Sequence, residues 1–531
     1  MLPDGRQHLR PPDGRERRER CDWTSLPIHP LLAAAYPVIF LFALNIAEQV
    51  TLAPLWLPLA LAVVDTAMLL AILGLVLRNW HRAALLTTVL VAGFFGYGHA
   101  WTAASEMLDS QWPLIVAWLL AVGIGLVVAW RIGSTHLTTA TRALNAVTLF
   151  LVVLNLTIVL TTRPVLGVES APEELTPLEL TAPDASPDVY FVILDRYAGS
   201  TALRETYGFD NEPFLTELEK RGFAVARHAH ANYIKTPLSL ASTLSMEPLD
   251  ADALKEQASD GSDRDPIHRV LGQRLAVPAA LKEIGYEYVQ IGNWWTPTNT
   301  NVDADLSLVY EGQDQFGSAL AQTTFLRALD DPAGAPDDPW DWPVMRENNL
   351  YALDRLDEVT SLPGPKYVFA HLVTTHPPYV HNADGSYTGR AQVARLGDVE
   401  SYRRQLTYAN SRMLAFVDRV LADDPDAIII LQADEGPFPA RYDDLEWNFK
   451  WRDATDAELE EKFGILFAMR VPDADLEAEG FHDAITPVNT FRMLFNARYG
   501  TDLALLPDRT WAHEDLYRFY DFFDISDRLR R

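Results

Sequence analysis

Five long apolar stretches follow one another near the N-terminus, and they constrain the fold more than any other feature of the sequence. Each approaches the ~20 apolar residues that a helix needs to cross a bilayer. They cover residues 31–49, 54–77, 83–101, 112–130 and 143–162. Buried core helices of a soluble protein would rarely occur as five such runs in series with short connections. The sequence therefore predicts a five-helix transmembrane domain over residues 31–162.

The charges of the connecting loops predict the orientation of these helices. Residues 1–30 form an Arg-rich tail, and arginines return in the second and fourth connections, for example Arg78 and Arg131. The first and third connections instead carry acids such as Glu48 and Glu106. Basic loops stay on the cytoplasmic side of a membrane. We therefore expect a multi-pass protein of the bacterial inner (cytoplasmic) membrane, with a cytoplasmic N-terminus and a periplasmic or extracellular domain after the fifth span.

One acidic residue, Asp65, lies inside the second predicted span. Ionisable residues within membrane spans are rare and usually functional, so Asp65 is a candidate functional residue. The alternative is a structural role, with a partner such as Asn45 in the first span.

Residues 163–186 are rich in Pro, Glu and Ala with little periodicity, which predicts an extended linker before a domain over residues 187–531. The net charge of −28 belongs to the chain after the spans and argues against nucleic acid as a partner. The only cysteine, Cys21, lies in the N-terminal tail. The predicted extracytoplasmic domain therefore has no internal disulfide and no cysteine nucleophile.

Within residues 187–531, compact apolar runs alternate with helical patterns. The runs that predict strands are VYFVIL before Asp195, YEYVQIGN at 286–293, KYVFAHLV at 366–373, AIIILQ at 427–432 and FGILFAMRV at 463–471. Helical patterns between them include NEPFLTELEKRG, HRVLGQRLAVPAALKEIG and ENNLYALDRLDEVTSL. The alternation predicts an α/β domain with a mostly parallel sheet sandwiched by helices.

Polar residues stand at the ends of three predicted strands. Asp195 follows the first, His371 and His376 lie near the end of the third, and Asp434 and Glu435 close the stretch IIILQADEGP. Ligands in open α/β sheets bind beyond the carboxyl ends of the strands. Two adjacent carboxylates at the end of a buried strand need a cation, a proton or water. If the strands are parallel and adjacent, these residues share one edge of the sheet and form a site.

A threonine hydroxyl completes the set of candidate groups. In NYIKTPLSLASTLSM, Pro237 marks the first turn of a helix and places Thr236 at its N-cap. Thr236 could serve only as a cap. A hydroxyl at a helix N-terminus also lies where backbone amides favour a phosphate, and a metal held by nearby carboxylates would activate it as a nucleophile.

Six blocks, in this order and spacing, resemble the sulfatase-like hydrolase/transferase family of the alkaline phosphatase superfamily. The blocks are PDVYFVILDRY, GFDNEPFLTELEKRGF, NYIKTPLSLASTLSM, FAHLVTTHPPYV, IIILQADEGP and TPVNTFRMLFNARYG. The resemblance covers nearly all of residues 187–500. With the five preceding spans, the layout is similar to that of lipoteichoic acid synthases and phosphoethanolamine transferases.

This resemblance implies one divalent metal ion and a covalent mechanism. Carried over to this chain, it assigns Asp195, Thr236, Asp434 and Glu435 as metal ligands and Thr236 as the nucleophile. His376, in HPPY, would contact the phosphate or the leaving group. His371 is a weaker candidate for substrate binding, because a position inside a strand also fits a packed core histidine.

The chain departs from the family at Glu435, where the usual residue is histidine. An oxygen ligand favours Mn²⁺, with Mg²⁺ or Ca²⁺ as alternatives, over Zn²⁺. The departure also leaves open a site that binds metal poorly, in a catalytically inactive sulfatase-like binding protein. Sulfatases themselves use a modified Cys or Ser followed by x-Pro-x-Arg, whereas this chain has Thr236-Pro-Leu-Ser-Leu, so a phosphorus ester is the favoured substrate.

The expected function is that of a membrane-anchored, metal-dependent phospho-group transferase. It would move a head-group phosphoester from a membrane phospholipid donor, through a phosphothreonine, to an extracytoplasmic glycan or lipid acceptor. The alternatives are a phosphodiesterase or phosphatase, which uses water as acceptor, and the inactive binding protein.

Overall fold

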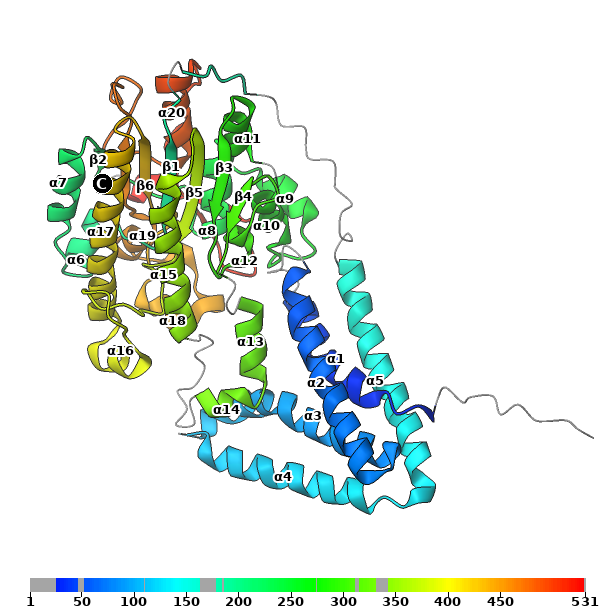
Figure 1. Cartoon of the computed structure of the whole chain (residues 1–531). Coiled ribbons are helices and arrows are strands. Elements are labelled where there is room, and N and C mark those ends of the chain that lie inside the picture. The colour runs from blue at the N-terminus through cyan, green and yellow to red at the C-terminus, as the bar shows by residue number, and fades with distance from the viewer. Residues whose placement is uncertain are drawn as a thin grey trace, which may run out of the picture.

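A computed structural model describes residues 25–45, 52–108, 110–162, 178–183, 186–273, 275–310, 315–330 and 342–529. Residues 1–24 of the predicted cytoplasmic tail, which include Cys21, and most of the predicted linker fall outside these ranges. Within them, a group of apolar helices lies beside a larger α/β domain (Figure 1).

The apolar stretches form five helices. Their bounds are α1 His29–Leu44, α2 Ala53–Leu77, α3 Trp80–Ala104, α4 Trp112–Arg131 and α5 Ser134–Thr162. Within the described ranges, four of them, α2 to α5, are long and apolar enough to cross a membrane, whereas α1 has 16 residues. The prediction of apolar N-terminal helices is thus confirmed, and the number of them that span a membrane stays a prediction.

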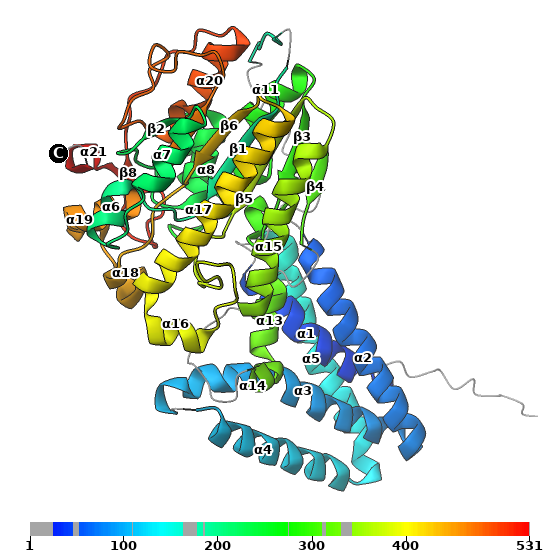
Figure 2. The same ribbon diagram turned by 60° about the vertical axis from the view of Figure 1, so that its left-hand side comes forward.

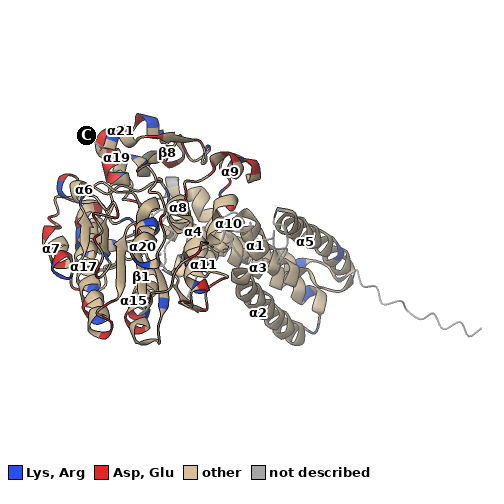
Figure 3. Cartoon of the chain, turned by 90° about the horizontal axis from the view of Figure 1, so that it is seen from above, with Lys and Arg blue, Asp and Glu red and all other residues tan. Residues whose placement is uncertain are grey.

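The outer surfaces of these helices are apolar. Leu57, Leu75 and Ile124 are each more than half exposed. Charged side chains gather on the α/β domain, and α1 to α5 are almost free of them (Figure 3). Helices that are apolar on their exposed sides are typical of a membrane environment.

The α/β domain is built on a seven-stranded sheet with the strand order β2-β7-β6-β1-β5-β3-β4. The strands are β1 Val189–Leu194, β2 Ala224–Ala226, β3 Glu287–Ile291, β4 Leu306–Leu308, β5 Lys366–Leu372, β6 Ile428–Gln432 and β7 Phe467–Arg470, and β8 Trp511–His513 with β9 Phe522–Asp524 form a separate antiparallel pair. Within the large sheet, β6, β1, β5, β3 and β4 pair in parallel, while β7 pairs antiparallel with β6 and with β2. The sheet is therefore mixed, and its parallel part contains β1, β5 and β6.

Helices cover both faces of this sheet, as the contacts of two neighbouring residues of β1 show. Tyr190 packs on Phe416, with ring centroids 5.5 Å apart, and the next residue, Phe191, packs on Phe491 at 5.0 Å. Successive strand residues point to opposite faces. Phe416 lies in α17 (Asp398–Asp423) and Phe491 in α20 (Thr490–Tyr499), so these two helices cover opposite faces of the sheet.

The remaining helices complete the two covering layers and the edges. They are α6 Ser200–Glu205, α7 Glu212–Lys220, α8 Thr236–Ser245, α9 Ala251–Gln257, α10 Asp265–Gly272, α11 Ala276–Glu283, α12 Thr296–Asn299, α13 Gln315–Thr323, α14 Leu326–Asp330, α15 Trp342–Glu358, α16 Arg390–Leu396, α18 Ala440–Leu445, α19 Asp456–Phe463 and α21 Ser526–Leu529. The single helical pattern expected from residue 268 is interrupted between α10 and α11. Pro278 explains the break, because its ring clashes with a helical carbonyl four residues earlier.

Two helices of the α/β domain leave it and pack on the apolar helices. α13 and α14 lie between the sheet and α3 in both views (Figures 1 and 2). Phe316 of α13 meets Phe42 of α1 edge to face, with ring centroids 5.5 Å apart. The backbone N–H of Phe325 donates to the Phe94 carbonyl of α3 at 2.8 Å. These contacts join the two parts of the chain.

Candidate functional site

The ends of β1, β5 and β6 bring the sequence-predicted polar residues to one edge of the sheet. β1 lies between β5 and β6 and is parallel to both. Ile193 is in register with His371 on one side and with Gln432 on the other. Asp195 and Asp434 each lie two residues further along their chains, so they reach the same level. The prediction that these residues share one edge is confirmed.

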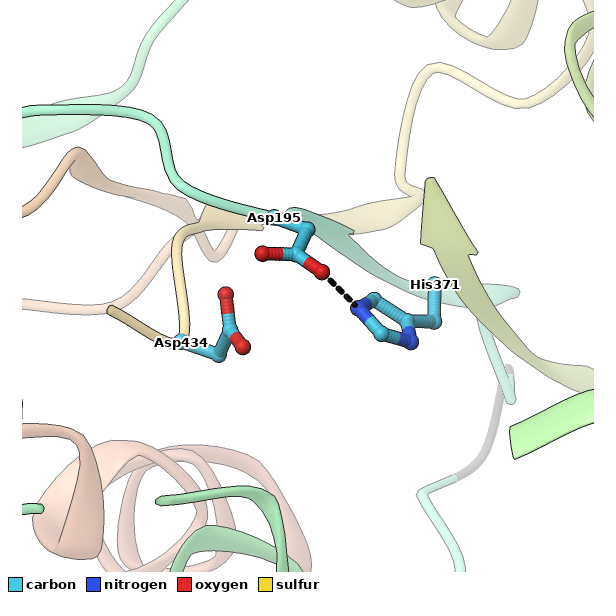
Figure 4. A group of neighbouring side chains, drawn as sticks. All are labelled: Asp195, His371 and Asp434. Atoms are coloured by element: carbon cyan, nitrogen blue, oxygen red, sulfur yellow. Dashed lines mark ion pairs between the residues drawn. The ribbon is translucent and has the colours of Figure 1, made fainter. Parts of the chain in front are cut away.

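Three of these side chains form a compact buried group. Asp195, His371 and Asp434 each offer a ligand atom, and these atoms all lie within 4.8 Å of one another. The group points into the space beyond the strand ends (Figure 4). The His371 Nε2 is 3.4 Å from the Asp195 Oδ2. Two carboxylates and an imidazole therefore converge with water largely excluded.

The facing atoms of this group lack ordinary partners. Among the described residues, the Asp195 Oδ1, both Asp434 oxygens and the His371 Nε2 are buried and accept or donate no hydrogen bond. Burial, and then the negative charges of Asp195 and Glu435, raise the pKa of Asp434 well above its usual value. Buried carboxyl groups in this state need a cation or a proton. The orphaned oxygen and imidazole atoms fit a divalent metal ion.

The ring of His371 is held in the orientation that a metal ligand needs. Its Nδ1 lies 2.8 Å from the Thr298 hydroxyl, so an N–H at Nδ1 can donate there and leave the Nε2 lone pair facing the carboxylates. The Asn293 side chain donates to the His371 carbonyl at 2.7 Å. His371 is fully buried, as a core histidine would be, but its Nε2 points into the carboxylate group.

Thr236 opens α8 beside this group. The N-cap is Lys235, Thr236 is the first helical residue, and no side-chain capping bond is made. The expectation that Thr236 caps the helix is therefore wrong, because Pro237 occupies the second helical position. The Thr236 side chain instead lies close enough to Asp434 to lower its pKa, although neither Asp434 oxygen forms a hydrogen bond of ordinary geometry within the described chain.

Glu435 is not part of the three-residue group, and one of its oxygens contacts two cations while the other, Oε2, is buried without a partner among the described residues. Its Oε1 is 2.9 Å from the Lys462 Nζ and 3.6 Å from the Arg196 Nε. Lys462 also donates to the Gly436 carbonyl at 2.9 Å. The predicted role of Glu435 as a ligand stays a prediction. Its observed contacts are those of a buried ion pair that fixes the chain after β6.

Breaking this ion pair gives a stability prediction. Lys462 and Glu435 are almost fully buried, so Lys462→Met leaves the carboxylate with only the longer Arg196 contact and should lower the free energy of unfolding by about 3 kcal/mol. Thermal unfolding of the purified chain measures the loss. Lys220→Met is the matched control, because its pair with Glu217 is exposed and should leave the melting temperature unchanged. Adding Glu435→Gln to Lys462→Met should recover part of the loss.

A small cavity of about 150 Å³ opens in front of the group, and basic and aromatic side chains dominate its walls. Arg196, Lys235 and Arg264 line it, together with Trp294 and Trp295. The Lys235 Nζ lies 4.0 Å from the centroid of the Phe438 ring. Burial lowers the pKa of Lys235 well below its usual value. The two guanidinium groups are suited to an anionic group such as a phosphoester, whose negative charge would in turn favour the protonated form of Lys235.

His376 lines the same cavity. Its Nδ1 is hydrogen-bonded to the Pro377 carbonyl, so Nδ1 carries the proton and Nε2 the lone pair. Burial, and then the positive charge of Arg196, lower the pKa of His376 to about 3. The ring is therefore neutral at physiological pH.

The sequence analysis named Asp195, Thr236, His376 and Asp434 as site residues. It treated His371 as a weaker candidate for substrate binding, because a packed core histidine would also fit its position. It did not name Lys235 or Lys462. Lys235 could have been named from the sequence, because it directly precedes the threonine at a helix start. Nothing in the sequence points to Lys462, which lies in α19, far along the chain.

Comparisons with known proteins give structural neighbours only. The sequence matches no family model and no curated protein. The C-terminal periplasmic domain of EcEptC from Escherichia coli, in a complex with Zn, is 15% identical with a TM-score of 0.41, over 66% of this chain and 96% of that one. The integral membrane protein lipooligosaccharide phosphoethanolamine transferase A (EptA) from Neisseria meningitidis is 13% identical with a TM-score of 0.37, over 88% and 95%. The lipoteichoic acid synthase LtaP from Listeria monocytogenes is 14% identical with a TM-score of 0.37, over 62% and 78%.

These names belong to the protein classes that the sequence blocks resemble. At such identities and TM-scores, the similarity does not assign the chain to a family.

Proposed function

We propose that this chain is a membrane-bound, metal-dependent phospho-group transferase with Thr236 as its nucleophile. The observation that carries the proposal is the buried convergence of Asp195, His371 and Asp434, with orphaned ligand atoms, beside the Thr236 hydroxyl. The donor is a membrane phospholipid, and the acceptor is an extracytoplasmic glycan or lipid.

Asp195, His371, Asp434 and Thr236 would hold the metal ion. When bound, the ion lowers the pKa of the Thr236 hydroxyl and neutralises charge on the phosphoryl oxygens. The ion would offset the negative charge of the buried carboxylates. The set contains both oxygen and imidazole ligands, which Mn²⁺ and Zn²⁺ each accept.

The remaining groups bind and orient the phosphoester. The backbone amides at the start of α8 and the side chains of Lys235 and Arg196 would hold its oxygens. The Thr236 Oγ then forms a bond to phosphorus as the bond to the departing lipid alcohol breaks, which leaves a phosphothreonine. The alkoxide that leaves takes up the proton that the Thr236 hydroxyl gives up, and departs as the free alcohol.

The second half of the reaction transfers the group to the acceptor. Neutral His376 can accept a hydrogen bond from the acceptor hydroxyl at Nε2 and so orient it, while that oxygen attacks phosphorus and the bond to Thr236 breaks. The proton of the acceptor hydroxyl passes to the departing Thr236 oxygen, which regenerates the threonine. A site next to helices that cross a membrane gives it access to lipid donors, which favours transfer between lipids and glycans over soluble phosphatase activity.

Label transfer tests this proposal. The purified chain would be reconstituted in vesicles whose phospholipid carries a labelled head-group phosphate, with Mn²⁺ or Zn²⁺ supplied. We expect a labelled peptide containing Thr236 and label that moves to an added glycan or lipid acceptor. Label released only to water, whatever the acceptor, would indicate a hydrolase. No label on Thr236 and no release with any donor or metal would overturn the proposal.

A further inference from the structure

A cavity of about 800 Å³ lies between the apolar helices and the α/β domain, away from the site. α2 lines it with Leu57 and Leu61, α3 with Phe94 and Phe95, and α13 with Leu320. The leucines of α2 are four residues apart, so they share one face of that helix. The cavity therefore has mainly apolar walls, which come from both parts of the chain.

The polar residues that line this cavity come mainly from the α/β domain. Thr296 and Asn299 of α12 contribute there, with Thr300, Tyr310 and Thr324. Asp65 is the acid of α2 that lines the cavity, twelve residues beyond Ala53 and about 18 Å further along the helix axis. Asn45, its alternative structural partner, donates its side chain to the Leu41 carbonyl instead. The lining contributed by α12 is thus polar, and that of α2 is mainly apolar.

α12 connects this cavity with the candidate site. Trp294 and Trp295 line the small cavity in front of the metal group, and the next residue, Thr296, lines the large one. The two cavities therefore meet opposite sides of one short segment. A molecule that lies along α2 with its polar end at α12 would place that end next to the site.

The cavity is open toward the surroundings of the apolar helices. Leu57 is 68% and Leu61 is 53% exposed, although both line the cavity. In a bilayer the surroundings at this depth are hydrocarbon, so water is not available to fill an apolar space of this size. An acyl chain can enter sideways between α2 and α13.

We propose that this cavity binds an acyl chain of the donor lipid, with the glycerol end at α12 and the chain running along α2 toward Asp65. This inference rests on the proposed function, because it assigns the cavity to the lipid from which the site takes its phosphoester. The size suits such a ligand, since binding cavities for small molecules span roughly 300–1,000 Å³. The gradient from polar α12 to apolar α2 matches the gradient along the lipid.

The test fills the cavity and compares two substrates. Leu57→Trp and Leu61→Trp add bulk inside it. Leu75→Trp and Val76→Trp are matched controls on the same helix, where the native side chains are 71% and 72% exposed and do not line the cavity. Each full-length variant is assayed with a diacyl phospholipid in vesicles and with bis(p-nitrophenyl) phosphate, a soluble phosphodiester without acyl chains.

We expect the cavity variants to lose about tenfold or more in kcat/KM for the diacyl lipid, mainly through KM, with the soluble substrate unaffected. The controls should match the wild type on both substrates. Unchanged lipid turnover in the cavity variants would overturn the acyl-chain site, and so would equal losses on both substrates. If the wild type turns over neither substrate, the proposed function itself fails, which is a distinct result.

Photo-crosslinking provides a second measurement that does not depend on turnover. A phospholipid with a diazirine on its acyl chain should label peptides from the Leu57–Leu61 face of α2 and from α13. Leu57→Trp should reduce that labelling, and Leu75→Trp should not. Labelling spread evenly over the outer faces of α4 and α5, without enrichment at α2 and α13, would contradict a bound chain.

Discussion

Replacing Thr236 with alanine should lower turnover of a phospholipid donor by about 10³-fold or more, because the covalent route loses its nucleophile. Thr236 lies at the start of α8, beside Asp434 and in the cavity lined by Arg196 and Lys235. Its side chain makes no capping bond, so its removal should leave the helix and the melting temperature nearly unchanged. Steady-state kinetics in vesicles, beside thermal unfolding, measure both quantities.

Two further expected results make this prediction specific to the Thr236 hydroxyl. Thr236→Ser keeps a hydroxyl at the same position and should retain measurable turnover and a labelled peptide. Thr236→Ala should still bind metal through Asp195, His371 and Asp434, although more weakly. Turnover in Thr236→Ala within tenfold of the wild type would refute the nucleophile assignment, since Thr236 alone carries a hydroxyl among the described residues that line the small cavity.

Much of the fold follows from the sequence because its strongest patterns are local. VYFVIL, KYVFAHLV and AIIILQ are strands in the structure, within a residue of the expected bounds. Each is fully buried, so an unbroken apolar run was sufficient to identify it. The three-residue strands β2 and β4 carry too few residues to show alternation. Their existence depends on neighbouring strands and not on their own sequence.

Much of the site could be predicted, but the grouping of its side chains could not. Asp195 and Asp434 follow buried strands, and parallel pairing with the central β1 brings them together. The sequence resemblance assigned Glu435 to the metal, and His371 was a weaker candidate for substrate binding. In the structure His371, level with Ile193, lies against the two aspartates, and Glu435 pairs with Lys462. That pair lies 27 positions apart along the chain, beyond any local pattern.

The preference for Mn²⁺ stays a prediction. It depended on Glu435 as an oxygen ligand in place of imidazole. The proposed ligand set instead contains His371, an imidazole from a different strand, which also suits Zn²⁺. The insertion of α13 and α14 among the apolar helices was also missed, because QFGSALAQT is too short for a predicted span and is amphipathic enough for a surface helix.

Metal binding should depend on His371 and Asp434 and not on Glu435. We expect one tightly held divalent ion per purified chain by elemental analysis, and loss of that ion in Asp434→Ala and in His371→Ala. Both variants remove an orphaned atom from the group whose ligand atoms lie within 4.8 Å of one another. Glu435→Gln should keep the ion, because the Glu435 carboxylate faces Lys462 and Arg196.

Thr298→Val tests a residue that orients the proposed ligand His371 without contacting the metal itself. It removes the hydroxyl beside the His371 Nδ1 and should weaken metal affinity by about 10–100-fold without abolishing binding. Loss of the ion in Glu435→Gln with retention in His371→Ala would reinstate the ligand set implied by the sequence resemblance. If the wild type holds no ion after Mn²⁺, Mg²⁺ and Zn²⁺ are supplied, the group is not a metal centre. The domain would then act as a binding protein whose buried carboxylates remain protonated, as the raised pKa of Asp434 permits.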